Sequence, residues 1–404
     1  MIHRKILGNG LKIVLEPITT VRSVAVGIWI KTGSRHENNE ENGISHFIEH
    51  MLFKGTSNYS PKQIAEAFDS IGGEINAFTS KEYTCLYAKV LDSHIDFALN
   101  ILTDMLFDST FLQEELDREK KVIMEEINMT EDTPDDIIHD YLAEVAYTSH
   151  PLANPILGSK ANIQLLSRDK LMQYYHHHYT AENIVVSVAG NVSAGYLDQL
   201  SARFSDVPSG KVQDEIKKPV FHPGNLKKSK DTEQAHLCLG FEGVGITDKN
   251  IYSFMLVNNV LGGSMSSRLF QEIREKYGMA YSIYSYHSSF IDTGMLTIYA
   301  GTSPNQLDDV QQLINQTLLE LKKDGITEKE FQNSKEQLKG LYLLSLESTN
   351  SRMSRNARNE LLLEKHPTMD DVIDEIDQMK MDQVAQVIDQ FAIDKGASTV
   401  ITSK

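Results

Sequence analysis

The sequence predicts an α+β protein made of two similar halves, each a mainly antiparallel sheet packed with helices. Stretches that alternate or run apolar, as strands do, are interspersed with stretches of helical period throughout the 404 residues. The order of these stretches in residues 1–210 recurs in residues 225–404, which indicates an internal repeat. Between them, residues 211–224 are punctuated by Pro, Gly and Lys and are expected to form a linker.

The first half is expected to begin with two strands and to continue with helices and further strands. Ser60-Pro61 predicts a helix start, because Pro is favoured in a first helical turn, and Gly72-Gly73 ends that helix. The expected strands are 11–16, 23–31, 74–80, 83–90 and 184–189. The expected helices are 61–71, 92–107, 111–129, 135–147, 168–177 and 194–205.

The second half is expected to follow the same plan. Strands are predicted at 234–241, 279–289, 293–301 and 398–401. Helices are predicted at 248–261, 264–276, 305–323, 327–345, 351–364, 369–377 and 381–391.

Residues 43–53 of the first half combine an apolar helical stripe with two histidines. The stripe consists of Ile44, Phe47, Ile48, Met51 and Leu52. His46 and His50 then lie one turn apart on an adjacent face, with Glu49 just off that face. Two such imidazoles can bind one zinc ion, and the carboxylate can act as a base on water. His-x-x-Glu-His is a metallopeptidase signature; the alternative is a surface helix with two solvated histidines.

A catalytic zinc ion needs a third protein ligand, which the predicted helix 111–129 can supply. Glu119 and Glu126 are seven residues apart and share a face, whereas Glu125 points elsewhere. One of the two could bind zinc while the other holds a histidine or water. The alternative is an acidic helix whose charges are merely solvated.

His46-x-x-Glu49-His50, followed by Glu126 in a Val-Ile-Met-Glu-Glu-Ile context, resembles the pitrilysin family of zinc peptidases over nearly the whole chain. The likeness is greatest to the short-chain branch that includes mitochondrial processing peptidase and its bacterial relatives. It implies one Zn²⁺ per chain on His46, His50 and Glu126, with Glu49 as general base. Glu119 matches a glutamate that supports catalysis one heptad before the distal ligand. The helix predicted at 248–261 stands in the corresponding place of the second half without these groups.

The resemblance also implies two substrate-binding elements. Asn76-Ala77-Phe78 matches a sheet edge that pairs with an extended peptide, although the strand alone reads as an ordinary core strand. Arg274 and Tyr281 match an Arg that holds substrate and a Tyr whose hydroxyl supports the oxyanion. Without the resemblance, Arg274 would be interpreted as a solvated helix residue.

Charge and cysteine content limit the kinds of binding partner and the cellular compartment that we expect for this protein. The net charge is −17, from 56 acidic and 39 basic residues, which argues against a nucleic-acid binder. It favours basic peptide substrates, or it serves solubility alone. Cys85 and Cys238, the only cysteines, are expected to be buried free thiols in a reducing compartment. No signal peptide or membrane span is recognised, so a cytoplasmic bacterial protein is expected.

The expected activity is zinc-dependent hydrolysis of peptide bonds inside a chamber. Active enzymes of the family that the chain resembles assemble four such half-units, and this chain has two. The resemblance therefore implies a dimer, most simply a homodimer, in which Arg274 and Tyr281 come from the opposite subunit. The alternatives are a non-catalytic assembly subunit and a catalytic subunit that needs a different partner chain.

Overall fold

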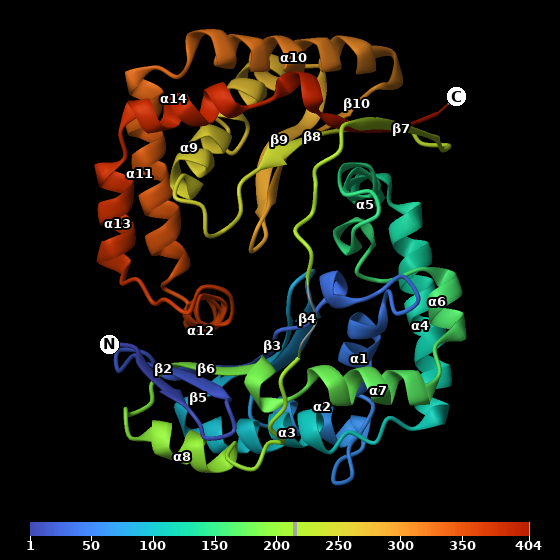
Figure 1. Ribbon diagram of the computed structural model, residues 1–404, viewed down its shortest axis with the longest axis vertical. Coiled ribbons are helices and arrows are strands. Elements are labelled where there is room, and N and C mark those ends of the chain that lie inside the picture. Colours follow the sequence, from blue (N-terminus) through green and yellow to red (C-terminus); the bar gives the residue numbers. More distant parts are fainter. Residues whose placement is uncertain (213–215, 404) are drawn as a thin grey trace. The chain divides into compact units, whose positions relative to one another are not determined.

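The computed structural model describes residues 1–212 and 216–403 and has an α+β fold (Figure 1). Unit 1 comprises Met1–Ile127, Asn154–Ile216 and Leu344–His366; unit 2 comprises Asn128–Ala153, Lys217–Leu343 and Pro367–Lys404. This division differs from the predicted domains 1–210 and 225–404, because each half of the sequence contributes a segment to the other unit. Within the predicted linker 211–224, residues 213–215 lie outside the described residues.

The sheet of unit 1 has the strand order β1-β2-β6-β3-β5-β4 among the described residues. β2 and β6 are parallel, and the other neighbours are antiparallel. The strands are β1 (His3–Ile6), β2 (Lys12–Pro17), β3 (Ser23–Ile30), β4 (Glu74–Thr79), β5 (Thr84–Leu91) and β6 (Ile184–Gly190).

The helices of unit 1 cover both faces of this sheet, because successive strand residues point to opposite faces. In β3, Val24, Val26 and Ile28 pack into the core formed with α1 and α3, whereas Ala25 and Trp29 pack against α12. α12 and α3 accordingly lie on opposite faces (Figure 1). The helices are α1 (Ile44–Leu52), α2 (Pro61–Ser70), α3 (Ile95–Phe107), α4 (Gln113–Asp132), α6 (Lys160–Leu165), α7 (Arg168–His178), α8 (Tyr196–Arg203) and α12 (Thr349–Arg358).

Unit 2 contains a sheet with the order β7-β11-β8-β10-β9 among the described residues, in which only β7 and β11 are parallel. Its strands are β7 (Gly224–Ser229), β8 (Ala235–Gly243), β9 (Ala280–Ser289), β10 (Gly294–Thr302) and β11 (Ala397–Thr402). Its helices are α5 (Pro134–Ala146), α9 (Ile251–Leu261), α10 (Leu307–Asp324), α11 (Glu328–Ser345), α13 (Met369–Gln378) and α14 (Met381–Gln390).

The two sheets share one topology, which confirms the predicted α+β fold with two similar halves. The order β2-β6-β3-β5-β4 corresponds to β7-β11-β8-β10-β9, with the parallel pair at the same place. α12, from late in the sequence, packs on the sheet of unit 1, and α5, from early in the sequence, packs on the sheet of unit 2.

Two predicted helices need correction, and the helix α6 and the strand β7 were not predicted. Residues 264–267 form bends and turns rather than the start of a helix, and the helical residues 268–269 lead into the π-helix η5 (Phe270–Lys276). The predicted helix 351–364 is α12 followed by the π-helix η7 (Asn359–Leu363). β7 begins at the last residue of the predicted linker and was not expected.

Cys85 and Cys238 are buried free thiols, as predicted. Among the described residues, no helix has the length and apolar character needed to cross a membrane.

Candidate metal centre

Helix α1 is fixed in position by its apolar stripe and by the glycine before it. Gly43 has a φ of 99°, in the left-handed region that favours glycine, and a Cβ there would meet Gly158 Cα at 2.8 Å. The stripe is fully buried in unit 1, and its members are Ile44, Phe47, Ile48, Met51 and Leu52. The rotation of α1 about its axis is therefore set by packing, and with it the direction of His46 and His50.

The start of α1 is capped by Glu37, from the loop before the helix. This carboxylate is 1% exposed, and it accepts hydrogen bonds from the backbone amides of Gly43 and Ser45, both at 2.8 Å. Asn42 Nδ2 donates to it at 3.2 Å. A carboxylate is favoured at a helix N-terminus, because it accepts hydrogen bonds from the otherwise unpaired amides and interacts favourably with the helix dipole. The sequence did not indicate this role, because Glu37 lies outside the positions of the usual cap motifs.

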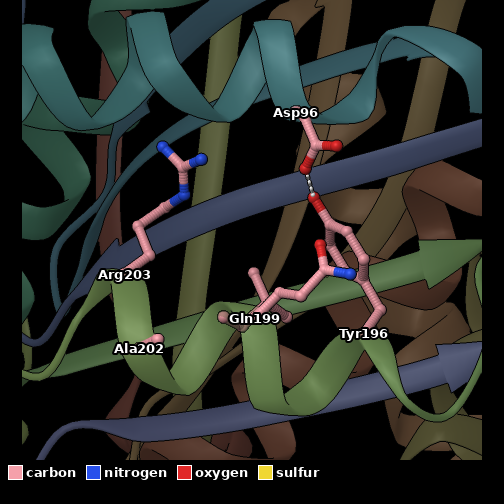
Figure 2. A pocket seen from close by; sticks show the side chains of 6 residues that line it. Asp96, Tyr196, Gln199, Ala202 and Arg203 are labelled. Carbon is pink, nitrogen blue, oxygen red and sulfur yellow. Dashed lines mark hydrogen bonds between the residues drawn. The ribbon is translucent and has the colours of Figure 1, made fainter.

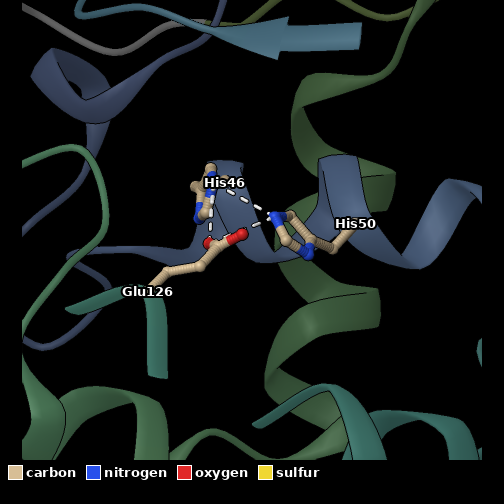
Figure 3. A group of neighbouring side chains, drawn as sticks. All are labelled: His46, His50 and Glu126. Atoms are coloured by element: carbon tan, nitrogen blue, oxygen red, sulfur yellow. Dashed lines mark hydrogen bonds and ion pairs between the residues drawn. The ribbon is translucent and has the colours of Figure 1, made fainter. Parts of the chain in front are cut away.

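Two histidines of α1 and one glutamate of α4 converge on a common point (Figure 3). The Nε2 atoms of His46 and His50 are 3.2 Å apart. Glu126 Oε2 lies 3.8 Å from His46 Nε2 and 3.5 Å from His50 Nε2. These are the residues that the motif and the resemblance assign to metal binding, and the structure brings all three together.

The donor set and its spacing fit zinc. Two imidazole nitrogens and a carboxylate oxygen are ligands that zinc accepts, and neighbouring ligands of a tetrahedral zinc ion are about 3.3 Å apart. Glu126 Oε2 is buried and has no hydrogen-bond partner among the described residues. A buried carboxylate oxygen without a hydrogen bond is costly, and a cation at this point would satisfy it.

Glu119 supports His50 from the side away from Glu126. His50 Nδ1 donates to Glu119 Oε1 at 2.8 Å, which leaves Nε2 directed at the ligand cluster. The other oxygen of Glu119 pairs with Lys54 Nζ at 2.7 Å. Of the two alternatives for the third ligand, the geometry thus favours Glu126, with Glu119 behind His50.

Burial and neighbouring charges change the titration of these groups. Burial, together with the nearby His50, lowers the pKa of His46 to about 3, so this imidazole is neutral and can offer a lone pair. For His50, burial is outweighed by the hydrogen bond to Glu119 and by the surrounding carboxylates, which raise its pKa. Burial raises the pKa of Glu49.

Glu49 is placed beside the ligand cluster and is held by the end of β4. Thr79 Oγ1 donates to Glu49 Oε2 at 2.6 Å. β4 is an edge strand, which pairs with β5 alone among the described strands of unit 1. Asn76, Ala77 and Phe78 are therefore on a sheet edge; Asn76 Oδ1 accepts from the Ala77 amide at 2.8 Å, and Phe78 packs edge-on against Trp29.

Arg274 and Tyr281 belong to unit 2, where they contact each other. The Arg274 guanidinium carbon lies 5.2 Å from the centre of the Tyr281 ring and 4.8 Å from that of Phe270. Arg274 is in the π-helix η5, a conformation that often marks functional segments. Tyr281, at the start of β9, is 79% exposed. Their proposed action on substrate stays a prediction.

A separate recess of about 460 Å³ lies between α3 and α8 (Figure 2). Three of its four polar side chains have partners within unit 1: Tyr196 donates to Asp96 at 2.5 Å, and Arg203 donates to Asn100 at 2.5 Å. None of the residues that bring chemistry to the metal centre lines this recess.

Family models match both halves of the chain. The model described as insulinase (peptidase family M16) matches residues 12–160, and the one described as peptidase M16 inactive domain matches residues 165–338.

Named relatives match nearly the whole chain, and a solved structure shares its fold. The uncharacterized zinc protease YmxG of Bacillus subtilis is 54% identical over 402 residues, covering 100% of this chain and 98% of that protein. An uncharacterized zinc protease of Streptomyces coelicolor is 39% identical, covering 96% and 86%. The crystal structure of a protease from Helicobacter pylori has the same fold, with a TM-score of 0.93, 22% identity and coverage of 100% and 99%. The chain therefore belongs to peptidase family M16, the pitrilysin family of zinc proteases, and is of the bacterial type.

Proposed function

We propose that this protein is a zinc-dependent endopeptidase, with zinc held by His46, His50 and Glu126. The observation that carries the proposal is the convergence of two imidazole nitrogens on a buried carboxylate oxygen that has no hydrogen-bond partner among the described residues. Membership of family M16 and relatives named zinc proteases support peptide hydrolysis as the reaction.

Glu49 is the proposed general base. A zinc ion in this site would supply Lewis acidity, which makes water a stronger acid and draws electrons from a peptide carbonyl. Glu49 accepts the proton of the attacking water and then delivers it to the leaving amine. Thr79 holds Oε2 of Glu49, so that Oε1 is the oxygen available for proton transfer.

The proposed substrate is an extended peptide that pairs with β4. Main-chain pairing to the edge formed by Asn76, Ala77 and Phe78 would grip any sequence, and alternate side chains would give selectivity. The net charge of −17 favours basic peptides by long-range attraction.

The proposed assembly is a homodimer that encloses a chamber in the cytoplasm. The family resemblance implies that a chain with two half-units needs a second chain. Arg274 would then bind substrate, and Tyr281 would donate a hydrogen bond to the oxyanion, in the active site of the opposite subunit.

Two other functions remain distinguishable by experiment. The match of residues 165–338 to an inactive-domain model favours a non-catalytic role for the second half. In a non-catalytic assembly subunit, the first half would lack catalytic activity as well. The complete ligand set of the first half favours catalysis. A catalytic subunit that requires a different partner chain is the third candidate.

Zinc content and hydrolysis of a quenched basic peptide, measured before and after chelation, test the proposal. We expect about one zinc per chain, loss of activity with a chelator and recovery with added zinc. Zinc without activity would indicate a missing partner chain. A chain that binds no zinc would contradict the proposal and favour the assembly role.

A further inference from the structure

The metal ligands are part of a longer ladder of side chains between α1 and α4. His46, His50 and Lys54 follow one another at intervals of four residues, and Lys54 keeps this spacing although α1 ends at Leu52. On α4, Glu126 and Glu119 are two turns apart on one face. Glu126 faces the two histidines, and Glu119 faces His50 and Lys54.

Lys54 and His50 hold the carboxylate of Glu119 from two sides. Lys54 Nζ is 2.7 Å from Oε2, and His50 Nδ1 is 2.8 Å from Oε1. The Glu119 side chain is only 4% exposed, whereas that of Lys54 is 29% exposed. Each oxygen thus has one strong, charge-assisted partner, and the carboxylate cannot rotate without breaking both contacts.

The fixed carboxylate determines what His50 offers to a metal. Because Glu119 accepts the Nδ1 proton, the lone pair of the neutral ring is on Nε2, the atom that faces His46 and Glu126. If Lys54 were removed, Oε2 of Glu119 would lose its partner in a largely buried place. The carboxylate would then turn or take up solvent, and His50 would lose its orientation.

We infer that Lys54 is a positioning residue for zinc binding, and that it acts through Glu119 on His50. This inference rests on the proposed zinc site and deepens it. An exposed Lys–Glu pair contributes little, but this pair has a buried carboxylate that is itself bonded to a ligand.

The first test is the zinc dissociation constant of Lys54→Met, measured by competition with a chromogenic chelator. We expect binding to weaken about 10- to 100-fold, the usual effect of losing a residue behind a ligand. Lys54→Arg, which keeps a charged donor for Glu119, should lose less than Lys54→Met. Lys62→Met removes the same charge at an exposed pair with Glu66 on α2 and should bind zinc like the wild type. Circular dichroism of the zinc-free variants checks that all are folded.

The second test is a double-mutant cycle with Glu119→Gln. If Lys54 acts through Glu119, adding Lys54→Met to Glu119→Gln should weaken zinc binding little further. Effects that multiply would overturn the inference, as would Lys54→Met binding zinc as tightly as the wild type. Those results, with zinc bound by the wild type, would leave the proposed function intact. A wild-type chain that binds no zinc would overturn the proposed function and this inference together.

Discussion

Thr79 donates a hydrogen bond of 2.6 Å from Oγ1 to Oε2 of Glu49. Thr79 is the last residue of the edge strand β4, and Glu49 lies between the two histidine ligands on α1. The hydrogen bond joins the strand proposed to pair with substrate to the proposed base. The position of a paired peptide and the position of the base are therefore coupled through one hydroxyl.

Replacing Thr79 by Val should impair proton transfer without affecting the metal. The Val side chain has a similar shape but cannot hold Glu49, so we expect kcat to fall about 10- to 100-fold. KM and zinc content should be unchanged. Thr79→Ser keeps the hydroxyl and should retain most of the activity. Equal kcat values for Thr79→Val and wild type would show that the hydrogen bond does not orient the base.

The cap on α1 should contribute strongly to stability. Glu37→Gln replaces one of the two oxygens that accept hydrogen bonds from the backbone amides of Gly43 and Ser45 by an NH₂ group. One of these buried amides is then left without an acceptor. We expect the free energy of unfolding in urea to fall by about 1–3 kcal/mol. Glu40→Gln, at an exposed position of the same loop, should change it by less than about 0.5 kcal/mol. Similar values for the two variants would contradict the capping role.

Acid should weaken the contact of η7 with the N-terminal strand. Glu360 is fully buried, and burial by itself would raise its pKa. The hydrogen bonds from His366 and from Nε and Nη2 of Arg4 outweigh this effect and lower the pKa of Glu360 to about 2. An acid whose pKa is lower in the folded than in the unfolded protein stabilises the fold above its ordinary pKa, near 4.5. That contribution is lost as the pH falls toward 2.

Glu360→Gln measures this contribution. We expect it to lower the unfolding free energy by about 2 kcal/mol near neutral pH, and by clearly less at about pH 3. Glu364→Gln removes a 64% exposed partner of Lys12 and should have little effect at either pH. A Glu360→Gln effect that does not diminish with acid would contradict the assigned ionisation.

Mixing two inactive variants should reveal whether Tyr281 acts across a dimer. Tyr281→Phe removes the proposed oxyanion donor, and we expect kcat to fall about 100-fold with zinc content unchanged. If subunits exchange, a mixture of Tyr281→Phe and Glu49→Gln chains contains sites with both wild-type groups only when the groups come from different chains. Activity should then recover to about a quarter of the wild-type value. No recovery, with exchange verified, would place both groups in one chain.

Local spacing predicted the residues of α1, whereas contacts distant in sequence could not be predicted. His46, Glu49 and His50 lie on one helix, so their mutual arrangement follows from the helical period alone. The periodicity of α4 placed Glu119 and Glu126 on one face but left their roles interchangeable. Thr79 lies at the end of an edge strand and Glu37 lies in a loop. Their contacts with Glu49 and with the start of α1 therefore cannot be predicted from helical periodicity.

Periodicity predicts that a segment is helical, but it does not predict which surface of the protein the helix packs against. The helical pattern of residues 351–364 was recognised, but not its packing on the sheet of unit 1, where Met353 contacts Trp29 and Asn356 donates to Glu16. The turns at 264–267 were not predicted, although serine occupies three of these four positions and has a lower helix propensity than the residues typical of helix interiors. β7 was missed because its Lys-rich sequence lacks the apolar alternation of a strand.

The most direct test of the central claim is Glu49→Gln, compared with wild type for zinc content and peptide hydrolysis. Gln keeps the shape of the side chain and leaves His46, His50 and Glu126 in place, but it cannot accept a proton. We predict about one zinc per chain, as in the wild type, with kcat reduced at least about 100- to 10,000-fold. His50→Ala should lose both zinc and activity. A Glu49→Gln protein that binds zinc and hydrolyses peptides at the wild-type rate would contradict the account.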